Sequence, residues 1–315
     1  MRAVVVVDGD VAVADRPTPT PRTGELLVRV AAAGLNGADQ LQRRGLYPPP
    51  KGAPADIPGL ELAGVVIERG PGTERFVPGD RVMSIVAGGG QAEMAVVPET
   101  TALPAVNGIS WAEAGGFAEV FVTAHDALFT QCQLVEGERL LVTGAAGGVG
   151  LAAVQLGRAR GADVVASVRR EELRHAVAAF GATAIDPAET AEHGPYDVVI
   201  ELVGALNLPI NLKALATRGR IVVIGIGAGG HTEIDLAQVM AKRAVVRGST
   251  LRARSLAEKA EASRRVGEEV LPLLATGEIT VPVAGTYPLE RAHDAYERFA
   301  AGAKLGKIVL EVPGA

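Results

Sequence analysis

The pattern of apolar and polar residues changes along the chain, and the change falls near residue 118. Before this point, short apolar runs alternate with glycine and proline, a pattern typical of strands joined by tight turns. The sequence therefore predicts a compact, turn-rich β domain in this part. The predicted strands cover residues 4–7, 25–30, 65–67 and 81–86.

After about residue 135 the pattern alternates between apolar strands and amphipathic helices. The strands are almost continuously hydrophobic, as strands buried on both faces of a sheet must be. This alternation predicts βαβ units and hence an α/β domain with a doubly wound parallel sheet. The predicted strands are 139–143, 164–168, 197–203 and 220–224, and the helices are 149–160, 171–180, 236–244 and 256–275.

The C-terminal stretch returns to strand-like runs. Residues 281–283 and 307–312 flank a helix predicted over 289–301. We interpret this stretch as part of the first domain. The expected organisation is a β-rich domain of residues 1–117, completed by 278–315, with a nucleotide-binding domain inserted at 118–277.

A glycine-rich turn joins the first strand and helix of the inserted domain. A pyrophosphate is bound by backbone N–H groups at a helix N-terminus, where the helix dipole favours negative charge and side chains would block the approach. The spacing is that of GxGxxG, with Ala145 in place of the first glycine. The turn predicts a dinucleotide site, and an ordinary glycine-rich helix entry is the alternative. The candidate residues are Gly144, Ala145, Gly147, Gly148, Val149 and Gly150.

The end of the second strand indicates which dinucleotide is bound. An acidic residue there would hydrogen-bond the adenosine ribose of NAD. This chain has Ser167, Arg169 and Arg170 instead, and guanidinium groups suit a 2′-phosphate. The sequence therefore predicts NADPH, with a solvated helix N-terminus as the other interpretation of the arginines.

Composition excludes several classes of protein. The 315 residues include one cysteine, Cys132, so the fold is neither a disulfide scaffold nor a cysteine zinc knuckle. With 31 basic and 36 acidic residues the net charge is −5, which does not favour nucleic-acid binding. No apolar run approaches the roughly 18 residues of a membrane span, and the N-terminus is not typical of a signal peptide. We therefore expect a soluble cytoplasmic protein.

Motifs of hydrolases and metalloenzymes do not occur. A serine hydrolase of the α/β class would carry GxSxG, which this chain lacks. The five histidines are scattered and form no HExxH motif. They are therefore expected to be surface or core residues.

A series of motifs, in order along nearly the whole chain, resembles the medium-chain dehydrogenase/reductase superfamily. The resemblance is closest to its zinc-independent quinone oxidoreductase branch, which includes zeta-crystallin-like and p53-inducible quinone reductase-like proteins. The matching segments are residues 33–39, 42–50, 58–64 and 79–82, then Glu119-x-x-x-Thr123-Ala124, the turn at 144–150, and 305–310.

The resemblance implies a GroES-like catalytic domain and a Rossmann NADPH-binding domain, with the nicotinamide in a cleft between them. Asn36 and Tyr47 match positions near the nicotinamide and the substrate, and Thr123 matches a threonine beside the nicotinamide. Other residues match loops that pass the nicotinamide. These are Val203, Gly204, Gly225, Ile226, Gly227, Thr250 and Leu251.

Two departures from the wider superfamily bear on the chemistry. Asn36 lies in the segment where zinc alcohol dehydrogenases have a metal-binding cysteine, and the cysteine-rich lobe is absent. Residues 185–188 lack a tyrosine that relatives often carry near the adenosine phosphate. The resemblance thus implies a zinc-independent NADPH:quinone oxidoreductase that transfers hydride to a quinone or an α,β-unsaturated carbonyl. The Tyr47 hydroxyl and the Asn36 amide are candidate donors to the developing oxyanion, and solvent is an equal candidate for the proton source.

Three other functions remain open at this point. The chain could be an enoyl thioester reductase, a non-catalytic NADPH-binding sensor or scaffold, or a zinc alcohol dehydrogenase. The sequence does not decide between one-electron and two-electron transfer. The resemblance also implies a homodimer formed through the edge of the nucleotide domain, near residues 245–250.

Overall fold

The computed structural model describes residues 1–314. The chain forms two compact units. The β-rich unit comprises Met1–Val122, Leu251–Gly302 and the C-terminal stretch from Gly306. The parallel-sheet unit comprises Thr123–Thr250 with Ala303–Leu305. These bounds differ from the expected ones, because the segment from Leu251 to residue 277 belongs to the β-rich unit.

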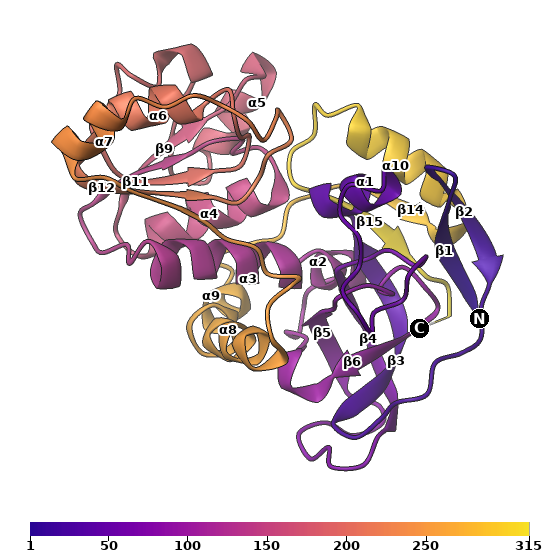
Figure 1. The fold of residues 1–315 in the computed structure, drawn as a ribbon. Helices are drawn as coiled ribbons and strands as arrows, with labels where there is room; N and C mark the ends of the chain where they lie inside the picture. The colour runs from indigo at the N-terminus through magenta and orange to yellow at the C-terminus, as the bar shows by residue number, and fades with distance from the viewer. Residues whose placement is uncertain (315) are drawn as a thin grey trace. The chain divides into compact units, whose positions relative to one another are not determined.

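The β-rich unit is built on a seven-stranded sheet (Figure 1). Its strand order is β14-β15-β3-β4-β5-β7, with β6 also paired to β3, and a separate hairpin of β1 and β2 begins the chain. The C-terminal strand thus lies beside β3, as the return to the first domain predicted. The strands are β1 (Arg2–Val7), β2 (Asp10–Asp15), β3 (Glu25–Gly34), β4 (Glu61–Arg69), β5 (Arg81–Ile85), β6 (Met94–Pro98), β7 (Ala102–Pro104), β14 (Val283–Pro288) and β15 (Lys307–Glu311).

Strand β3 is the centre of this sheet and of its core. It pairs antiparallel with β4, β6 and β15, and its registers include Val28 with Val66 and Val309 with Gly34. Pairing with β15 extends β3 to Gly34, beyond the predicted end at residue 30. The buried apolar side chains of these strands form one core cluster with α10. Short helices complete the unit: α1 (Gly37–Arg43), α2 (Trp111–Gly115), and α10 (Ala292–Ala300) after the single turn Leu289–Arg291.

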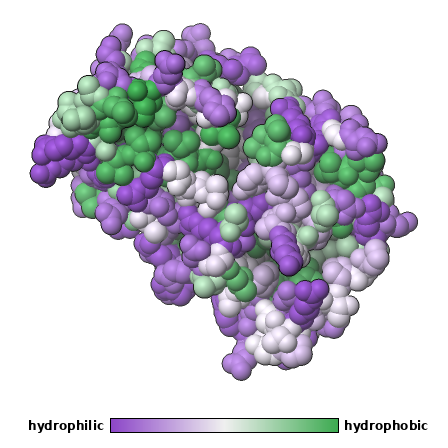
Figure 2. Space-filling view, in the orientation of Figure 1, coloured by the Kyte–Doolittle hydropathy of each residue, from purple (hydrophilic) through white to green (hydrophobic). Residues whose placement is uncertain are grey.

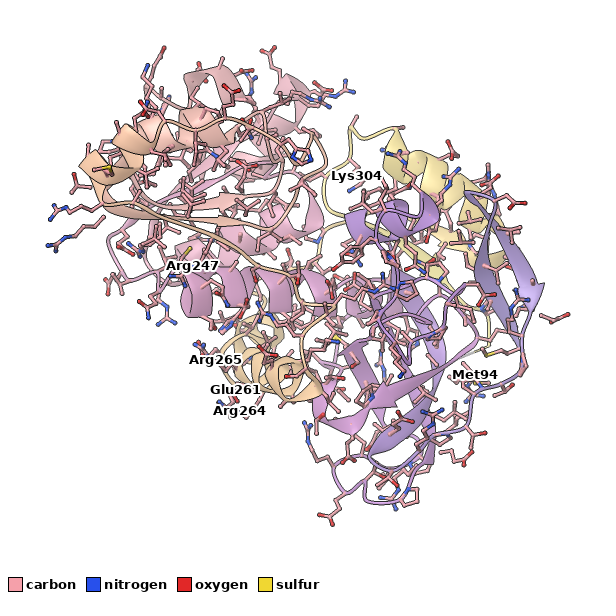
Figure 3. The ribbon with its side chains drawn as sticks, in the orientation of Figure 1. Met94, Arg247, Glu261, Arg264, Arg265 and Lys304 are labelled. Carbon is pink, nitrogen blue, oxygen red and sulfur yellow. The ribbon has the colours of Figure 1, made fainter. Side chains whose placement is uncertain are left out.

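The helix predicted over 256–275 is interrupted. The structure has α8 (Leu256–Glu269) and α9 (Leu271–Thr276), separated at Val270. Pro272 lies in the first turn of α9, and proline cannot continue a helix because it lacks the N–H and clashes with the preceding turn. The exposed face of α8 carries ion pairs of Arg264 with Glu261 and Glu268 (Figure 3).

The parallel-sheet unit contains six parallel strands in the order β10-β9-β8-β11-β12-β13. Numbered along the chain, this order is 3-2-1-4-5-6, that of a dinucleotide-binding sheet. The predicted doubly wound α/β fold is therefore confirmed. The strands are β8 (Arg139–Val142), β9 (Asp163–Ser167), β10 (Thr183–Ile185), β11 (Tyr196–Glu201), β12 (Leu215–Val223) and β13 (Val245–Gly248). The helices are α4 (Gly148–Ala159), α5 (Glu171–Ala178), α6 (Leu208–Ala214) and α7 (Leu236–Lys242).

The boundary between the units falls within α3 (Ala118–His125). This helix continues into the π-helical stretch Asp126–Gln131. Neither was predicted from the sequence, because residues 118–131 show no clean helical periodicity of polar positions. Among residues 1–314, no helix is long and apolar enough to cross a membrane.

Candidate functional site

Most of the predicted cofactor residues lie at one edge of the parallel sheet. Because all six strands run in the same direction, their carboxyl ends meet along one edge, where doubly wound proteins bind nucleotides. Loops that lie far apart in the chain are thereby brought together. Residues 143–150 follow β8, residues 168–170 follow β9, 202–204 follow β11, 225–227 follow β12, and 249–250 follow β13.

The glycine turn has the geometry that a bound pyrophosphate requires. Gly144 has a φ of +58°, in the left-handed region that favours glycine. Gly147 caps α4 in an extended conformation, and the first turn of this helix contains no acidic residue. A Cβ atom on Gly150 would lie 2.6 Å from the Cα atom of Ala145, so the helix can start this close to the turn only with glycine. The open N-terminus of α4 therefore fits a dinucleotide phosphate.

A buried carboxylate organises the loop after β11, next to the glycine turn. Glu201 is fully buried and accepts hydrogen bonds from the backbone N–H groups of Val203 (2.6 Å) and Gly204 (2.7 Å). The Thr143 hydroxyl donates to the same carboxylate at 3.0 Å, and the Asn211 amide does so at 2.5 Å. This carboxylate ties the ends of β8 and β11 together. It was not predicted from the sequence, although an acid at the end of an apolar strand is a signal that could have been used.

The basic residues after β9 differ in how they are engaged. Ser167 is buried, whereas Arg169 and Arg170 are exposed. Arg170 lies 3.7 Å from Glu172, and Arg169 forms no ion pair with any residue of 1–314. The nearby Arg174 is instead bound to Asp186 and to the Val168 carbonyl. Of the three arginines, Arg169 is thus without an ion pair among residues 1–314, Arg170 lies near Glu172, and Arg174 is held by Asp186.

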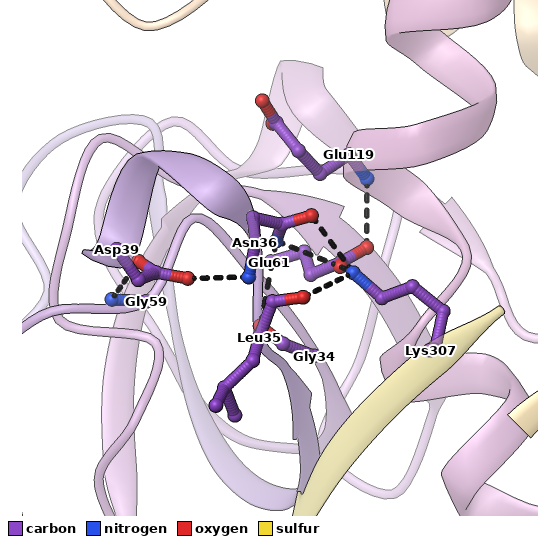
Figure 4. Close-up of polar contacts among 8 residues, drawn as sticks. All are labelled: Gly34, Leu35, Asn36, Asp39, Gly59, Glu61, Glu119 and Lys307. Atoms are coloured by element: carbon purple, nitrogen blue, oxygen red, sulfur yellow. Dashed lines mark hydrogen bonds and ion pairs between the residues drawn. The ribbon is translucent and has the colours of Figure 1, made fainter. Parts of the chain in front are cut away.

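A buried polar cluster lies in the β-rich unit (Figure 4) and consists of Asn36, Asp39, Glu61 and Lys307. Lys307 Nζ lies 2.6 Å from Glu61 Oε1 and also donates to the Leu35 carbonyl and to Asn36 Oδ1, each at 2.7 Å. Glu61 is fully buried and Lys307 is 3% exposed. A buried ion pair of this kind is retained only where further hydrogen bonds satisfy both groups. Sequence reasoning did not identify this pair, because its two residues are far apart in the chain.

The amide of Asn36 is fully used inside this cluster. Its Oδ1 accepts from Lys307, and its Nδ2 donates to Glu61 Oε1 at 2.9 Å and to the Gly34 carbonyl at 3.4 Å. The side chain is 8% exposed. The sequence analysis predicted that this amide donates to a substrate oxyanion. In the structure, both of its N–H groups are already used in hydrogen bonds within the cluster. The structure places Asn36 at the start of α1, as a residue that joins the cluster to that helix.

Asp39 completes the cluster on the side of α1. It accepts hydrogen bonds from the backbone N–H groups of Asn36 (2.8 Å) and Gly59 (3.1 Å). Burial raises the pKa of Asp39 to about 6, although these two hydrogen bonds and Lys307 favour the charged form. The carboxylate therefore holds the start of α1 against the loop at Gly59.

Tyr47 is held by a buried arginine that was not identified from the sequence. Arg252 is 4% exposed, and its guanidinium lies 5.2 Å from the centre of the Tyr47 ring. It also donates to the carbonyls of Tyr47 (3.0 Å) and Ala87 (2.8 Å) and to Gln42 Oε1 (2.7 Å). The Tyr47 hydroxyl forms no hydrogen bond within residues 1–314. Burial, followed by the charge of Glu119, raises the pKa of Tyr47, so this hydroxyl is a donor at neutral pH.

Glu119 lies beside the cluster, at the start of α3. Its backbone N–H donates to Glu61 Oε2 at 2.8 Å, and its own carboxyl group points away from Glu61 (Figure 4). The side chain is half-buried, and its carboxyl group has no hydrogen-bond partner in the described chain. Burial, followed by the charge of Glu61, raises the pKa of Glu119 to about 8. From the sequence, Glu119 was noted only as part of a family motif.

The remaining predicted residues lie near the unit boundary. Thr123 is the first residue of the parallel-sheet unit, Thr250 follows β13, and Leu251 begins the next segment of the β-rich unit. Cys132 is buried and unpaired, and burial raises the pKa of its thiol to about 12. No group of three or more His, Cys, Asp or Glu residues within 1–314 is arranged to hold a metal ion.

Known proteins share this combination of units. Residues 22–133 match the alcohol dehydrogenase GroES-like domain family, and residues 148–266 match the zinc-binding dehydrogenase family. The quinone oxidoreductase of Rattus norvegicus is 31% identical over 308 residues, which cover 94% of this chain and 92% of the rat protein. The chain belongs to the quinone oxidoreductase branch of the medium-chain dehydrogenase/reductase superfamily. The predicted family is thus confirmed, and the chain is an oxidoreductase of this superfamily.

Two further relatives show the range of this superfamily. The acryloyl-coenzyme A reductase of Metallosphaera sedula is 33% identical over 322 residues, covering 93% of each chain. The solved structure of mycobacterial Rv1454c in complex with NADPH superposes with a TM-score of 0.88 at 27% identity, covering 99% of each chain. Members with this fold therefore include proteins named for quinones and for an enoyl thioester.

Proposed function

We propose that this protein is an NADPH-dependent reductase of quinones or small α,β-unsaturated carbonyl compounds. The observation that carries the proposal is the similarity to quinone oxidoreductases over more than nine-tenths of the chain, joined to a glycine turn with the geometry of a phosphate site. The two units supply different parts of the reaction, namely cofactor binding and acceptor binding.

The parallel-sheet unit would hold the cofactor by its carboxyl edge. The N-terminus of α4 would receive the pyrophosphate, and Arg169 and Arg170 would pair with the 2′-phosphate. Ser167 ends β9 where an NAD-specific protein has an acid, so the end of this strand carries no carboxylate that would repel that phosphate. The bound cofactor would supply hydride from C4 of its nicotinamide.

The β-rich unit would bind the acceptor through Tyr47. Its unpartnered hydroxyl can donate a hydrogen bond to an oxygen that gains negative charge. Asn36, with its amide occupied, would act by holding α1 against Glu61 and Lys307. A quinone or enone suits such a site, because hydride addition to it moves the new charge onto oxygen, where one hydrogen-bond donor stabilises it. We therefore propose zinc-independent chemistry for this chain.

The test is oxidation of NADPH measured against a panel of quinones, small enones and enoyl thioesters, with NADH as the cofactor control. We expect acceptor-dependent oxidation with quinones or enones and a higher kcat/KM with NADPH. Binding of NADPH with no turnover of any acceptor would contradict the proposal and favour a sensor or scaffold.

An enoyl thioester reductase is the second candidate. The similarity to the acryloyl-coenzyme A reductase favours this function. Its sequence identity to this chain and the share of the chain that it covers are about the same as for the quinone oxidoreductases. The hydride chemistry is the same, and only the acceptor differs. A kcat/KM for an enoyl thioester well above that for its free enone would select this function.

We also propose a homodimer formed through β13. This strand ends the parallel sheet with one edge unpaired, and Val245 and Val246 are each more than a third exposed. Figure 2 shows apolar side chains gathered over α7 and the neighbouring strands, where Leu236 and Met240 are exposed. An edge of this kind must be paired or protected. Light scattering should give twice the chain mass for the wild type and the single-chain mass for Val246→Lys.

A further inference from the structure

The proposed reaction needs a proton as well as hydride. Hydride addition leaves an electron pair on the acceptor oxygen, which must then gain H⁺. The Tyr47 hydroxyl can stabilise this oxygen, but its raised pKa makes the tyrosine a poor source of a proton at neutral pH. A carboxyl group with a pKa near neutrality is better matched to such a transfer.

The backbone of Glu119 is held by a hydrogen bond, whereas its carboxyl group has no hydrogen-bond partner among residues 1–314. The backbone N–H of Glu119 is bound to Glu61 Oε2 at 2.8 Å, which attaches the start of α3 to the buried polar cluster. Glu61 is itself held by Lys307 and Asn36. The Glu119 carboxyl group then extends away from Glu61 (Figure 4), and the residue as a whole is not fully buried. It lies near enough to Tyr47 for its charge to raise the pKa of that hydroxyl.

The charges around Glu119 are mixed. Burial and the carboxylates of Glu61 and Asp39 disfavour its charged form, whereas Lys307 and Lys259 favour it. The result is a carboxyl group with a pKa of about 8, which is mostly protonated at pH 7. The titratable groups that face it come from six segments of the β-rich unit. They are Asp39 in α1, Tyr47 in the loop after α1, Glu61 in β4, Arg252 before α8, Lys259 in α8 and Lys307 in β15.

We propose that the Glu119 carboxyl group is the proton donor that completes reduction of the acceptor. This inference rests on the proposed function. Once hydride has bonded to the acceptor, the acceptor oxygen takes the proton as the O–H bond of Glu119 breaks. The acceptor has then gained two electrons and two hydrogens, and Glu119 is a carboxylate. Reprotonation of Glu119 by solvent completes the cycle before the next turnover.

The first test measures the carboxyl group without cofactor or acceptor. Infrared or NMR titration of the protein should show one carboxyl group that ionises near pH 8 and disappears in Glu119→Gln. The matched control is Glu68→Gln, which removes an exposed carboxyl group from β4 in the same unit. Ionisation of Glu119 near pH 4.5 would overturn the proposal whether or not the protein reduces quinones.

The second test uses turnover. The kcat/KM for the acceptor should fall above about pH 8 in the wild type and should be about 10²-fold lower, without this pH limb, in Glu119→Gln. Glu68→Gln should match the wild type. Tyr47→Phe should lower kcat/KM but keep the limb near pH 8, since the acid is still present. Wild-type activity in Glu119→Gln would overturn the proposal and leave the proposed function intact, and inactivity of the wild type would contradict the proposed function alone.

Folding of the variant can be verified separately. A carboxyl group with a raised pKa stabilises the folded state below its unfolded pKa, and this contribution is lost as the pH rises through about 8. Glu119→Gln should therefore be at least as stable as the wild type at pH 9. If it does not fold, Glu119→Asp keeps a shorter carboxyl group, and its kcat/KM should lie well below the wild type while keeping a pH limb. Wild-type kcat/KM in Glu119→Asp would equally overturn the proposal.

Discussion

The cofactor edge of the parallel-sheet unit and the buried polar cluster of the β-rich unit are built in different ways. The first consists of backbone, with glycines at Gly144, Gly147 and Gly150 that let the start of α4 lie close to the turn. The second consists of charged side chains that satisfy one another, with Glu61 and Lys307 at the centre. A backbone site depends on local sequence, whereas a side-chain site depends on strands and helices far apart in the chain.

The largest expected effect comes from breaking the buried ion pair. Lys307→Met leaves the Glu61 carboxylate buried without a cation and should lower the free energy of unfolding by about 3–5 kcal/mol. The exposed pair on α8 is the matched control, and Arg264→Ala should change stability much less. Both changes are measured by urea unfolding.

A double-mutant cycle makes this prediction sharper. Glu61→Gln combined with Lys307→Met removes both charges, so it should cost less stability than the sum of the two single changes. Strict additivity would show that the two side chains do not depend on each other, and Glu61 and Lys307 would then not form the coupled centre of the cluster.

The next effect concerns the glycine turn. Gly150→Ala places a Cβ atom 2.6 Å from the Cα atom of Ala145, so the turn must move. We expect a loss of about 1–3 kcal/mol in stability, and weaker NADPH binding by calorimetry. Gly285→Ala is the control, because its Cβ would meet neighbours at the ordinary distances of 3.6 and 3.7 Å. Unchanged NADPH affinity in Gly150→Ala would contradict the phosphate role of this turn.

The smallest effect concerns discrimination between cofactors. Replacing Arg169 and Arg170 by alanine should raise KM for NADPH by about 10- to 100-fold, the value of one or two charge-assisted hydrogen bonds, and should change KM for NADH little. Arg247→Ala removes an exposed arginine of β13 and should alter neither value (Figure 3). Equal responses to both cofactors would show that the two arginines do not bind the 2′-phosphate.

The same contrast explains what could be predicted from sequence. The strand–glycine turn–helix pattern at 139–160 and the alternation after it give the parallel sheet, because each signal lies within one short segment. The sequence around a buried charged residue does not differ from that around a surface one, so its burial cannot be predicted until its partner is known. This applies to Glu61, Lys307 and Arg252. Pro272 was visible, but the amphipathic pattern on both sides of it obscured the break between α8 and α9.

Asn36 shows that a role known from relatives cannot be assigned to this chain from a local motif alone. Its position was predicted, and the structure places it in the cluster with Lys307 and Glu61. Its hydrogen bonds depend on Lys307, more than 270 residues away, which the local motif does not contain. The side chains of Tyr47 and Glu119, which have no hydrogen-bond partner among residues 1–314, are distinguished from Asn36 only by three-dimensional contacts.

Deuterium transfer tests the central claim most directly. With NADPH carrying deuterium at both C4 positions of the nicotinamide and a small enone as acceptor, we expect deuterium on the β-carbon of the reduced product. One equivalent of product should form for each equivalent of NADPH oxidised, with the oxygen or α-carbon proton coming from solvent-exchangeable groups. Acceptor-dependent oxidation without deuterium in the product, or no oxidation with any quinone or enone, would contradict hydride transfer by this protein.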